Sequence, residues 1–249
     1  MGVVFKDTRL QSEFENEGYV IVDFIDTESA KSLLSSYEEL MAQNRKRSDS
    51  PTRSHETEIS IFNKNKEFTK AVHQEIVKTF AKGADELLND YVPIMGNMVY
   101  KNPEETRDFS LHQDWRFSDE TEHTTINIWC PLIDTNVQNG TLHVVKRSHL
   151  FQKETIRGAN IGDASNKASE FIKEHFGTSL SLKMGQAAIL NTQLYHFSPP
   201  NLSKTARPVA LLAMLPKEAE MSFYYKRPRT DSDEMSIEKY KIDAEFMTS

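Results

Sequence analysis

The sequence predicts a mainly β fold, a sandwich or barrel that is supported by helices on its N-terminal side. Short apolar runs between residues 97 and 215 are separated by Gly, Pro, Asn and Asp, which is typical of strands joined by turns. The first ninety residues instead repeat their apolar positions every three or four residues, the period of a helix that buries one face. In a chain of 249 residues, these patterns favour a single domain.

The N-terminal segment is predicted to be helical with one strand inserted. Leu10 and Phe14 mark a short helix that Gly18 ends, and the β-branched run 19–22 predicts the strand that follows. Asp26-Thr27 can cap a second helix. The apolar face of that helix is formed by Leu33, Leu34, Tyr37, Leu40 and Met41.

A polar stretch, residues 43–58, separates the second helix from a third. Its charged and small polar residues cannot build a core, so we expect a mobile loop that can fold over a pocket. From Phe68 to Tyr91 the helical spacing returns, and a long amphipathic helix is expected to pack on the β core.

Five runs are predicted as strands of that core: Asn97–Tyr100, Thr125–Trp129, Thr141–Val145, Ala187–Leu190 and Pro208–Leu215. Residues 151–177 are too long for a hairpin turn and contain a helical pattern, the kind of insertion that often carries specificity. We therefore divide the single domain 1–249 into a helical support at about 1–92, a β core at about 93–216 and a C-terminal tail at about 217–249.

Composition excludes several classes of protein. The formal charge of −7 argues against a general nucleic-acid binder, and no window approaches the ~18 apolar residues of a membrane span. A single cysteine, Cys130, excludes an internal disulfide and a multi-thiolate zinc site, and it fits a reducing compartment. We expect a cytoplasmic protein that acts on neither nucleic acid nor membrane.

Three residues form the candidate metal site. His112 and Asp114 lie two positions apart on an expected strand, so both side chains point to one face. His196 lies near the end of another expected strand, which opens after the Gly185 turn, and a barrel could return it to the first strand. Two imidazoles and one carboxylate form the facial triad of non-haem Fe(II) oxygenases. Zinc hydrolases can use the same donors, so the triad by itself leaves both chemistries open.

Arg207 distinguishes between these chemistries. It stands eleven positions after His196 and immediately before the last apolar strand. A guanidinium inside an apolar barrel needs an anion, and its planar fork binds a carboxylate through two hydrogen bonds. A dicarboxylic keto acid could chelate iron at one end and meet Arg207 at the other, a requirement that a zinc hydrolase does not have.

From about residue 10 to about residue 216 the sequence resembles the phytanoyl-CoA dioxygenase family of Fe(II)/2-oxoglutarate-dependent oxygenases. The resemblance rests on motifs that occur in the same order. They are Glu17–Val22, His112-Gln113-Asp114, Asn139–His149, His196-Phe197-Ser198 and Arg207.

The resemblance implies a double-stranded β-helix, the cupin-like jelly roll, with flanking N-terminal α-helices. It further implies that His112, Asp114 and His196 hold Fe(II) and that Arg207 grips the distal carboxylate of 2-oxoglutarate, with dioxygen as the oxidant. Ser198, Trp129 and Asn97 match positions that contact this cosubstrate. Lys146-Arg147 replaces the family's usual Pro-Gly and alters one turn, while the presence of Asp114 argues against a halogenase.

The function implied is oxidation, most simply hydroxylation, of a C–H bond in a small organic or thioester-tethered metabolite, with 2-oxoglutarate converted to succinate and carbon dioxide. The alternative is a non-catalytic metal-binding jelly roll that senses a ligand. Trp115 and Phe117 follow the metal motif and either face the substrate or close the core. Two basic clusters, at 45–53 and 226–229, are either solvated surface or a recognition site for an anionic handle such as coenzyme A or a carrier protein.

Overall fold

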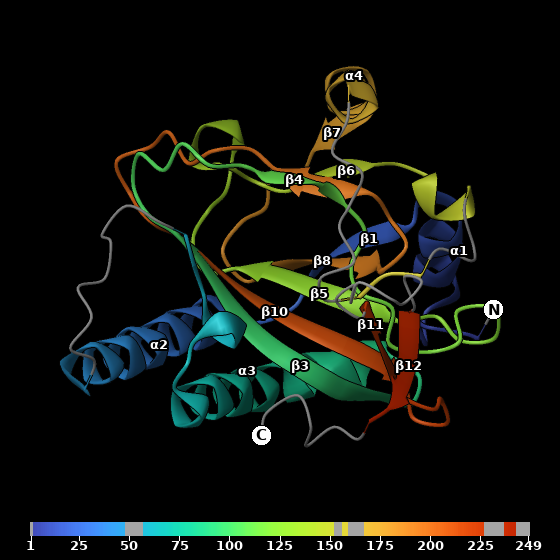
Figure 1. Cartoon of the computed structure of the whole chain (residues 1–249), viewed down its shortest axis with the longest axis horizontal. Helices are drawn as coiled ribbons and strands as arrows, with labels where there is room; N and C mark the ends of the chain where they lie inside the picture. The colour runs from blue at the N-terminus through green and yellow to red at the C-terminus, as the bar shows by residue number, and fades with distance from the viewer. Residues whose placement is uncertain (1, 48–56, 152–155, 159–166, 227–236, 243–249) are drawn as a thin grey trace, which may run out of the picture.

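The computed structural model describes residues 2–47, 57–151, 156–158, 167–226 and 237–242. Two antiparallel sheets face each other, and the chain crosses repeatedly from one to the other (Figure 1). The larger sheet has the order β1-β8-β5-β10-β3-β2, and the smaller has the order β4-β9-β6-β7. The predicted jelly roll is therefore confirmed.

The strands of the larger sheet are β1 (Tyr19–Asp23), β2 (Glu58–Ile59), β3 (Tyr91–Lys101), β5 (Ile126–Pro131), β8 (Gln186–Asn191) and β10 (Arg207–Pro216). The smaller sheet contains β4 (Phe109–His112), β6 (His143–Val145), β7 (Gly177–Ser179) and β9 (His196–Ser198). The five predicted strands correspond to β3, β5, β6, β8 and β10, and β3 begins earlier than predicted, at Tyr91.

The central strands of the larger sheet are buried on both faces, which explains their nearly continuous apolar sequences. On β5, Ile126, Ile128 and Cys130 belong to the core shared with the helices, whereas Trp129 packs between the sheets. Because successive side chains alternate in direction, Asn127 and Trp129 share the inner face. That face forms one wall of the functional site.

Helices cover the outer face of the larger sheet. Helix α2 (Thr27–Arg47) packs on α3 (Lys66–Leu87), which in turn packs on β3 and β10 (Figure 1). The Asp26 carboxylate accepts the Ser29 amide at 2.7 Å, as expected of a helix cap. The expected loop at 43–58 is wrong at its start, because residues 43–47 continue α2; residues 48–56 lie outside the described residues.

The short first helix, α1 (Thr8–Glu17), ends as predicted at Gly18, whose φ of 86° is left-handed. A second glycine turn, at Gly140 with φ of 73°, ends the 3-10 helix η2 (Val137–Asn139). Two further 3-10 helices, η1 (Ser60–Phe62) and η3 (Ser148–Leu150), precede α3 and follow β6. Of these, η1 lies beside the site described below.

The insertion and the tail each contain described structure. The insertion ends in α4 (Lys167–Phe176), close to the predicted helical pattern, and the tail forms a hairpin of β11 (Ser222–Lys226) and β12 (Ile237–Lys241). The basic clusters extend into residues 48–56 and 227–236, which lie outside the described residues. Among the helices that the structure describes, none combines the length and apolar character needed to cross a bilayer.

Candidate metal centre and adjoining cavity

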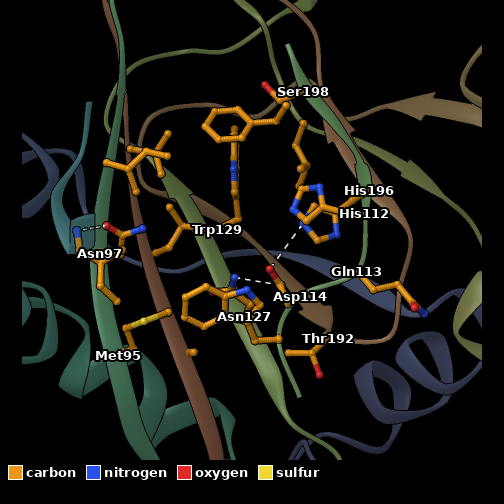
Figure 2. Close-up of a pocket in the computed structure, with 18 of the residues that line it drawn as sticks. Met95, Asn97, His112, Gln113, Asp114, Asn127, Trp129, Thr192, His196 and Ser198 are labelled. Atoms are coloured by element: carbon orange, nitrogen blue, oxygen red, sulfur yellow. Dashed lines mark hydrogen bonds and ion pairs between the residues drawn. The ribbon is translucent and has the colours of Figure 1, made fainter. Parts of the chain in front are cut away.

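A cavity of about 240 Å³ lies between the two sheets. Its wall is built from both sheets and from η1 (Figure 2). The seven residues singled out from the sequence all line it: Asn97, His112, Asp114, Trp129, His196, Ser198 and Arg207. The structure therefore brings these seven side chains into one space, and the roles assigned to them stay predictions.

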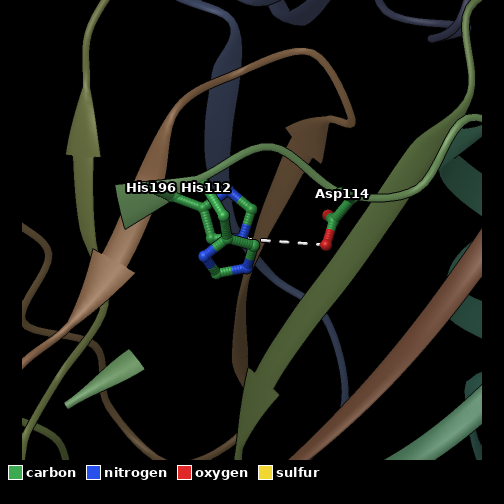
Figure 3. Close-up of side chains that lie close together, drawn as sticks. All are labelled: His112, Asp114 and His196. Carbon is green, nitrogen blue, oxygen red and sulfur yellow. Dashed lines mark ion pairs between the residues drawn. The ribbon is translucent and has the colours of Figure 1, made fainter. Parts of the chain in front are cut away.

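The candidate metal ligands lie together at one side of the cavity. His112 on β4 pairs directly with His196 on β9, and their ring centroids are 4.2 Å apart. Asp114 faces both rings, with its Oδ1 atom 3.7 Å from His196 Nε2 (Figure 3). One ligand atom from each residue falls within 4.8 Å of the others, close enough to share one ion. In the described ranges, no second group of three His, Cys, Asp or Glu residues meets this condition.

Two local expectations about these ligands are wrong. Strand β4 ends at His112, so Asp114 lies beyond it and is held by its amide, which donates to Thr192 O at 3.0 Å. His196 does not end the strand that opens after Gly185. That strand, β8, stops at Asn191, and a turn carries the chain across to the other sheet, where His196 begins β9.

Hydrogen bonds fix the orientation of each ligand. His112 Nδ1 donates to Ser110 O at 2.6 Å, and His196 Nδ1 donates to Leu194 O at 2.9 Å. Because a carbonyl only accepts, both Nδ1 atoms carry the proton, which leaves Nε2 as the lone-pair donor for a metal. Burial, followed by the neighbouring His112, lowers the pKa of His196 and keeps its ring neutral.

The Asp114 carboxylate is held in the same way, because Asn127 Nδ2 donates to its Oδ2 atom at 3.0 Å. Outer partners of this kind orient ligands and tune metal affinity. The other histidines in the described part of the chain do not join this group. His73, for example, accepts the Gly96 amide at 2.8 Å.

Arg207 is a buried cation without a carboxylate partner in the described part of the chain. Its side chain is among the largest fully buried ones, at 1% exposure. Nη2 donates to Ser198 Oγ at 3.2 Å, the guanidinium lies 5.7 Å from the Trp129 ring, and Nε has no hydrogen-bond partner. Burial lowers the pKa of Arg207 to about 9, so the charge persists at neutral pH. A buried charge of this kind is costly unless an anion joins it.

Trp129 and Asn97 both line the cavity but differ in their other contacts. Trp129 also belongs to the apolar core between the sheets. Asn97 Oδ1 accepts the Ser60 hydroxyl at 2.9 Å and the Ile61 amide at 3.1 Å, which attaches η1 to β3. Contact of either residue with a cosubstrate stays a prediction.

Lys101 is a second buried cation, and the sequence analysis missed it. It pairs with Arg207 across β3 and β10 and is completely buried. Its ammonium donates to Ser198 O and Ser198 Oγ, both at 3.0 Å, and to Pro199 O. Burial, and secondly the charge of Arg207, lower the pKa of Lys101 to about 7. Lys101 therefore fixes the end of β9 and the Ser198 hydroxyl.

Lys101 should make stability depend on pH in the apo-protein. Its folded-state pKa, about 7, lies below the ordinary lysine value of 10.5, so the unfolded chain binds the proton more strongly between these values. The destabilisation is absent above pH 10.5, grows as pH falls and is complete below pH 7. We expect the unfolding free energy of the native chain to rise between pH 7 and pH 9.5. This rise should exceed the corresponding change in Lys101→Met by about 3 kcal/mol. Urea unfolding of both proteins at both pH values measures this difference. An equal change of unfolding free energy with pH in the native chain and in Lys101→Met would contradict it.

A buried ion pair supports the backbone at Asp114. Arg157 Nη2 donates to Glu120 Oε1, and Arg157 Nε donates to Asp114 O at 2.7 Å. Glu120 Oε2 also accepts Gln193 Nε2 at 3.1 Å. The side chains of Arg157 and Glu120 are 6% and 2% exposed. This network anchors residues 156–158 of the insertion beside the candidate metal centre.

Removing one partner of this pair should destabilise the fold. In Arg157→Met, Glu120 keeps its neutral hydrogen bonds and the more distant Arg116, 3.9 Å away, but loses its close counter-charge in a buried place, and we expect a loss of about 3 kcal/mol. Guanidinium chloride unfolding provides the measurement. The double variant with Glu120→Gln should recover part of the loss, and a double variant that is less stable than Arg157→Met would contradict this account of the pair.

Three supporting residues were thus missed, and only one left a signal in the sequence. Asn127 stands two positions before Trp129 on the same strand, so period-two alternation could have placed it in the cavity. Lys101 ends a strand, where lysine is usual, and Arg157 lies in an insertion without periodicity. Burial of the last two depends on the tertiary fold.

A jelly roll that brings two histidines and one carboxylate to a cavity has the donor set that 2-His-1-carboxylate non-haem iron enzymes use. A family model described as phytanoyl-CoA dioxygenase (PhyH) matches residues 14–209. The chain therefore belongs to the phytanoyl-CoA dioxygenase family.

A curated relative from Dictyostelium discoideum, a phytanoyl-CoA dioxygenase domain-containing protein 1 homolog, is 30% identical over 118 residues. The match covers 44% of this chain and 41% of the relative, so it spans about two fifths of that protein's length.

Solved structures share the fold. The non-heme alpha-ketoglutarate-dependent carbocyclase SnoK superposes with a TM-score of 0.62 at 15% identity, covering 86% of each chain. The epimerase SnoN, in complex with Fe3+, alpha-ketoglutarate and nogalamycin RO, gives 0.60 at 16% identity and covers 86% of this chain and 85% of its own. AviO1 from Streptomyces viridochromogenes Tue57 gives 0.58 at 17% identity, with 85% and 96% covered.

Proposed function

We propose that this protein is an Fe(II)- and 2-oxoglutarate-dependent oxygenase that oxidises a C–H bond of a small organic molecule. One observation carries the proposal most strongly: the cavity that contains the His112, Asp114 and His196 group also contains the buried Arg207, which has no carboxylate partner among the described residues. The three ligands can hold a metal ion, and Arg207 can bind an anion in the same enclosed space. A 2-oxo dicarboxylate can chelate the metal at one end and pair with the guanidinium at the other. Membership of the phytanoyl-CoA dioxygenase family agrees with this.

The residues present fit the implied groups. His112 and His196 would offer Nε2, and Asp114 would offer a carboxylate oxygen, since their other polar atoms are held by the protein. Arg207 would bind the distal carboxylate beside Ser198. With iron, 2-oxoglutarate and dioxygen bound, this site supplies the oxidising power for a C–H bond, with succinate and carbon dioxide as products.

The protein's own contribution is positioning and exclusion of water. The ligands are fixed before any ion binds, and the cavity walls are largely apolar, so few water molecules compete with the reactants. Hydroxylation is the simplest outcome, and we propose it ahead of desaturation, cyclisation or epimerisation. A free small molecule, or the reacting part of a coenzyme A or carrier-protein thioester, is the proposed substrate.

The alternative, a non-catalytic jelly roll that binds metal and senses a ligand, lacks a reason for the buried charge of Arg207. A structural metal site needs only its ligands, whereas a buried guanidinium without a carboxylate partner costs stability. The combination therefore favours catalysis.

The test is anaerobic and spectroscopic. Apo-protein is loaded with Fe(II), 2-oxoglutarate is added, and the visible metal-to-ligand charge-transfer band is recorded. Formation of the band, followed by succinate release when air is admitted with a substrate library, is the expected result. Absence of the band in folded, iron-loaded protein would contradict the oxygenase proposal and favour the non-catalytic metal-binding alternative.

A further inference from the structure

We propose that the substrate is an uncharged, mainly apolar molecule and that Asn127 binds a hydroxyl or N–H group on it. This inference rests on the proposed function and names the substrate class of the same site. Three observations carry it: an unpartnered buried acceptor on Asn127, a set of described charged lining residues that each already has a partner or a proposed role, and an apolar lining around the acceptor.

The Asn127 amide has one possible orientation. Its Nδ2 atom lies 3.0 Å from Asp114 Oδ2, and the reversed amide would place two oxygens there without a proton between them. Figure 2 shows the Asn127 amide beside Asp114. The Oδ1 atom must therefore point elsewhere.

Asn127 Oδ1 is buried and has no hydrogen-bond partner. The residue as a whole is 8% exposed and lines the cavity. A buried acceptor without a donor costs about 1–3 kcal/mol, and a bound group with an O–H or N–H removes that cost. Asp114 directs Oδ1 toward His196 and Oδ2 toward Asn127, so a metal held by the three ligands would leave this acceptor available to a third component.

Asn127 lies at the end of the cavity away from the cosubstrate anchor. It pairs with Ala213 on β10, whereas Arg207 begins that strand. Six residues of extended strand separate the two backbone positions along β10, so Asn127 lies toward the metal end of the cavity and Arg207 begins the strand at the other end. The metal ligand Asp114 touches Asn127, which places this acceptor beside the position where a substrate carbon would react.

The charges that line the cavity in the described part of the chain are already assigned. Apart from the histidines, the charged lining residues are Asp114, Arg157 and Arg207. Asp114 belongs to the metal group, Arg207 is the proposed cosubstrate anchor, and Arg157 is neutralised by Glu120. Among the described residues, an ionised substrate group would thus find no available counter-charge in the cavity, which is strongly unfavourable.

The other polar side chains near Asn127 are directed to the protein. Thr192 Oγ1 donates to Thr125 O at 3.1 Å, and Gln113 Nε2 donates to Gln193 O. Figure 2 shows both side chains turned away from the space between the sheets. What remains around the acceptor is apolar, namely Met95, Phe117, Trp115 and, 66% exposed at the opening, Phe62.

The test compares four probes that share one phenylethyl group. They are 2-phenylethanol, which donates a hydrogen bond; its methyl ether, which only accepts; ethylbenzene, which does neither; and 3-phenylpropanoate, which is charged. Binding to the full chain, loaded with redox-inert Zn(II) and saturating 2-oxoglutarate, is measured by saturation-transfer NMR. The variants are Asn127→Leu and its matched control Met95→Leu. Met95 on β3 and Asn127 on β5 both pair with Ala213 on the strand between them, β10.

We expect the native chain to bind the alcohol about fivefold or more tightly than the ether, and the carboxylate most weakly of all. Asn127→Leu should abolish the preference for the alcohol, and Met95→Leu should keep it. Equal binding of alcohol and ether, a preference that survives in Asn127→Leu, tightest binding of the carboxylate, or no binding of any probe to the loaded protein would each overturn the inference. Failure of the proposed function is seen separately, as absence of the Fe(II)–2-oxoglutarate band.

Discussion

Asp114→Ala is expected to lower Fe(II) affinity by about 100-fold or more and to abolish the charge-transfer band at any practical 2-oxoglutarate concentration. Loss of a group that merely orients a ligand costs 10- to 100-fold, and Asp114 would be a ligand itself. The two histidines would remain, but two neutral imidazoles neither complete the triad nor offset the charge of the ion. Anaerobic titration with Fe(II), followed by absorbance, measures both effects.

His143→Ala is the matched control for that experiment. His143 lies on β6 of the same small sheet and stacks near Phe197, with ring centroids 4.9 Å apart, but it is not one of the grouped ligands. It should retain iron binding and the band. Equal iron affinity in the native chain and Asp114→Ala would rule out this metal centre.

Arg207→Met is expected to raise the dissociation constant for 2-oxoglutarate by about 100-fold while leaving iron binding intact. Two charge-assisted hydrogen bonds to the distal carboxylate would be lost, worth about 3 kcal/mol together. Methionine fits the apolar surroundings and removes a buried charge, so the variant should fold. The band, titrated with 2-oxoglutarate on iron-loaded protein, gives the constant.

A second ligand separates this effect from a general disturbance of the site. 2-Oxopentanoate has the same chain length and the same keto-acid end but no distal carboxylate. It should bind weakly to the native chain and equally weakly to Arg207→Met. A 100-fold loss for both ligands would show that the substitution damages the metal end, and no loss for 2-oxoglutarate would reject Arg207 as its anchor.

Much of the fold could be predicted because its signals are local. Apolar spacing located α2 and α3, and the left-handed Gly18 ended α1 as expected. Strands β5 and β10 were evident because burial on both faces demands continuous apolar sequence. The residues that gather in the cavity were found through motif order and family resemblance.

The errors arise where tertiary contacts override a local pattern. Asp114 lies on the same side as His112 because Thr192 O holds its amide, and the strand has already ended. Lys101 and Arg157 belong to residue types that are normally exposed to solvent, and their burial arises from the tertiary packing. No periodicity reports such burial, so the supporting network of the site could not be read from the sequence.

The direct pairing of His112 with His196 also has a thermodynamic consequence. Strands β4 and β9 are four and three residues long, with few ladder bonds of their own, yet they hold ligands that are far apart in the sequence. An ion shared by them would link the two strands of the small sheet, and its binding site would form only when these strands pair. At 100 times its dissociation constant such an ion adds about 2.7 kcal/mol to the unfolding free energy. Cellular iron supply would then govern how much of this protein survives proteolysis as well as how much is active.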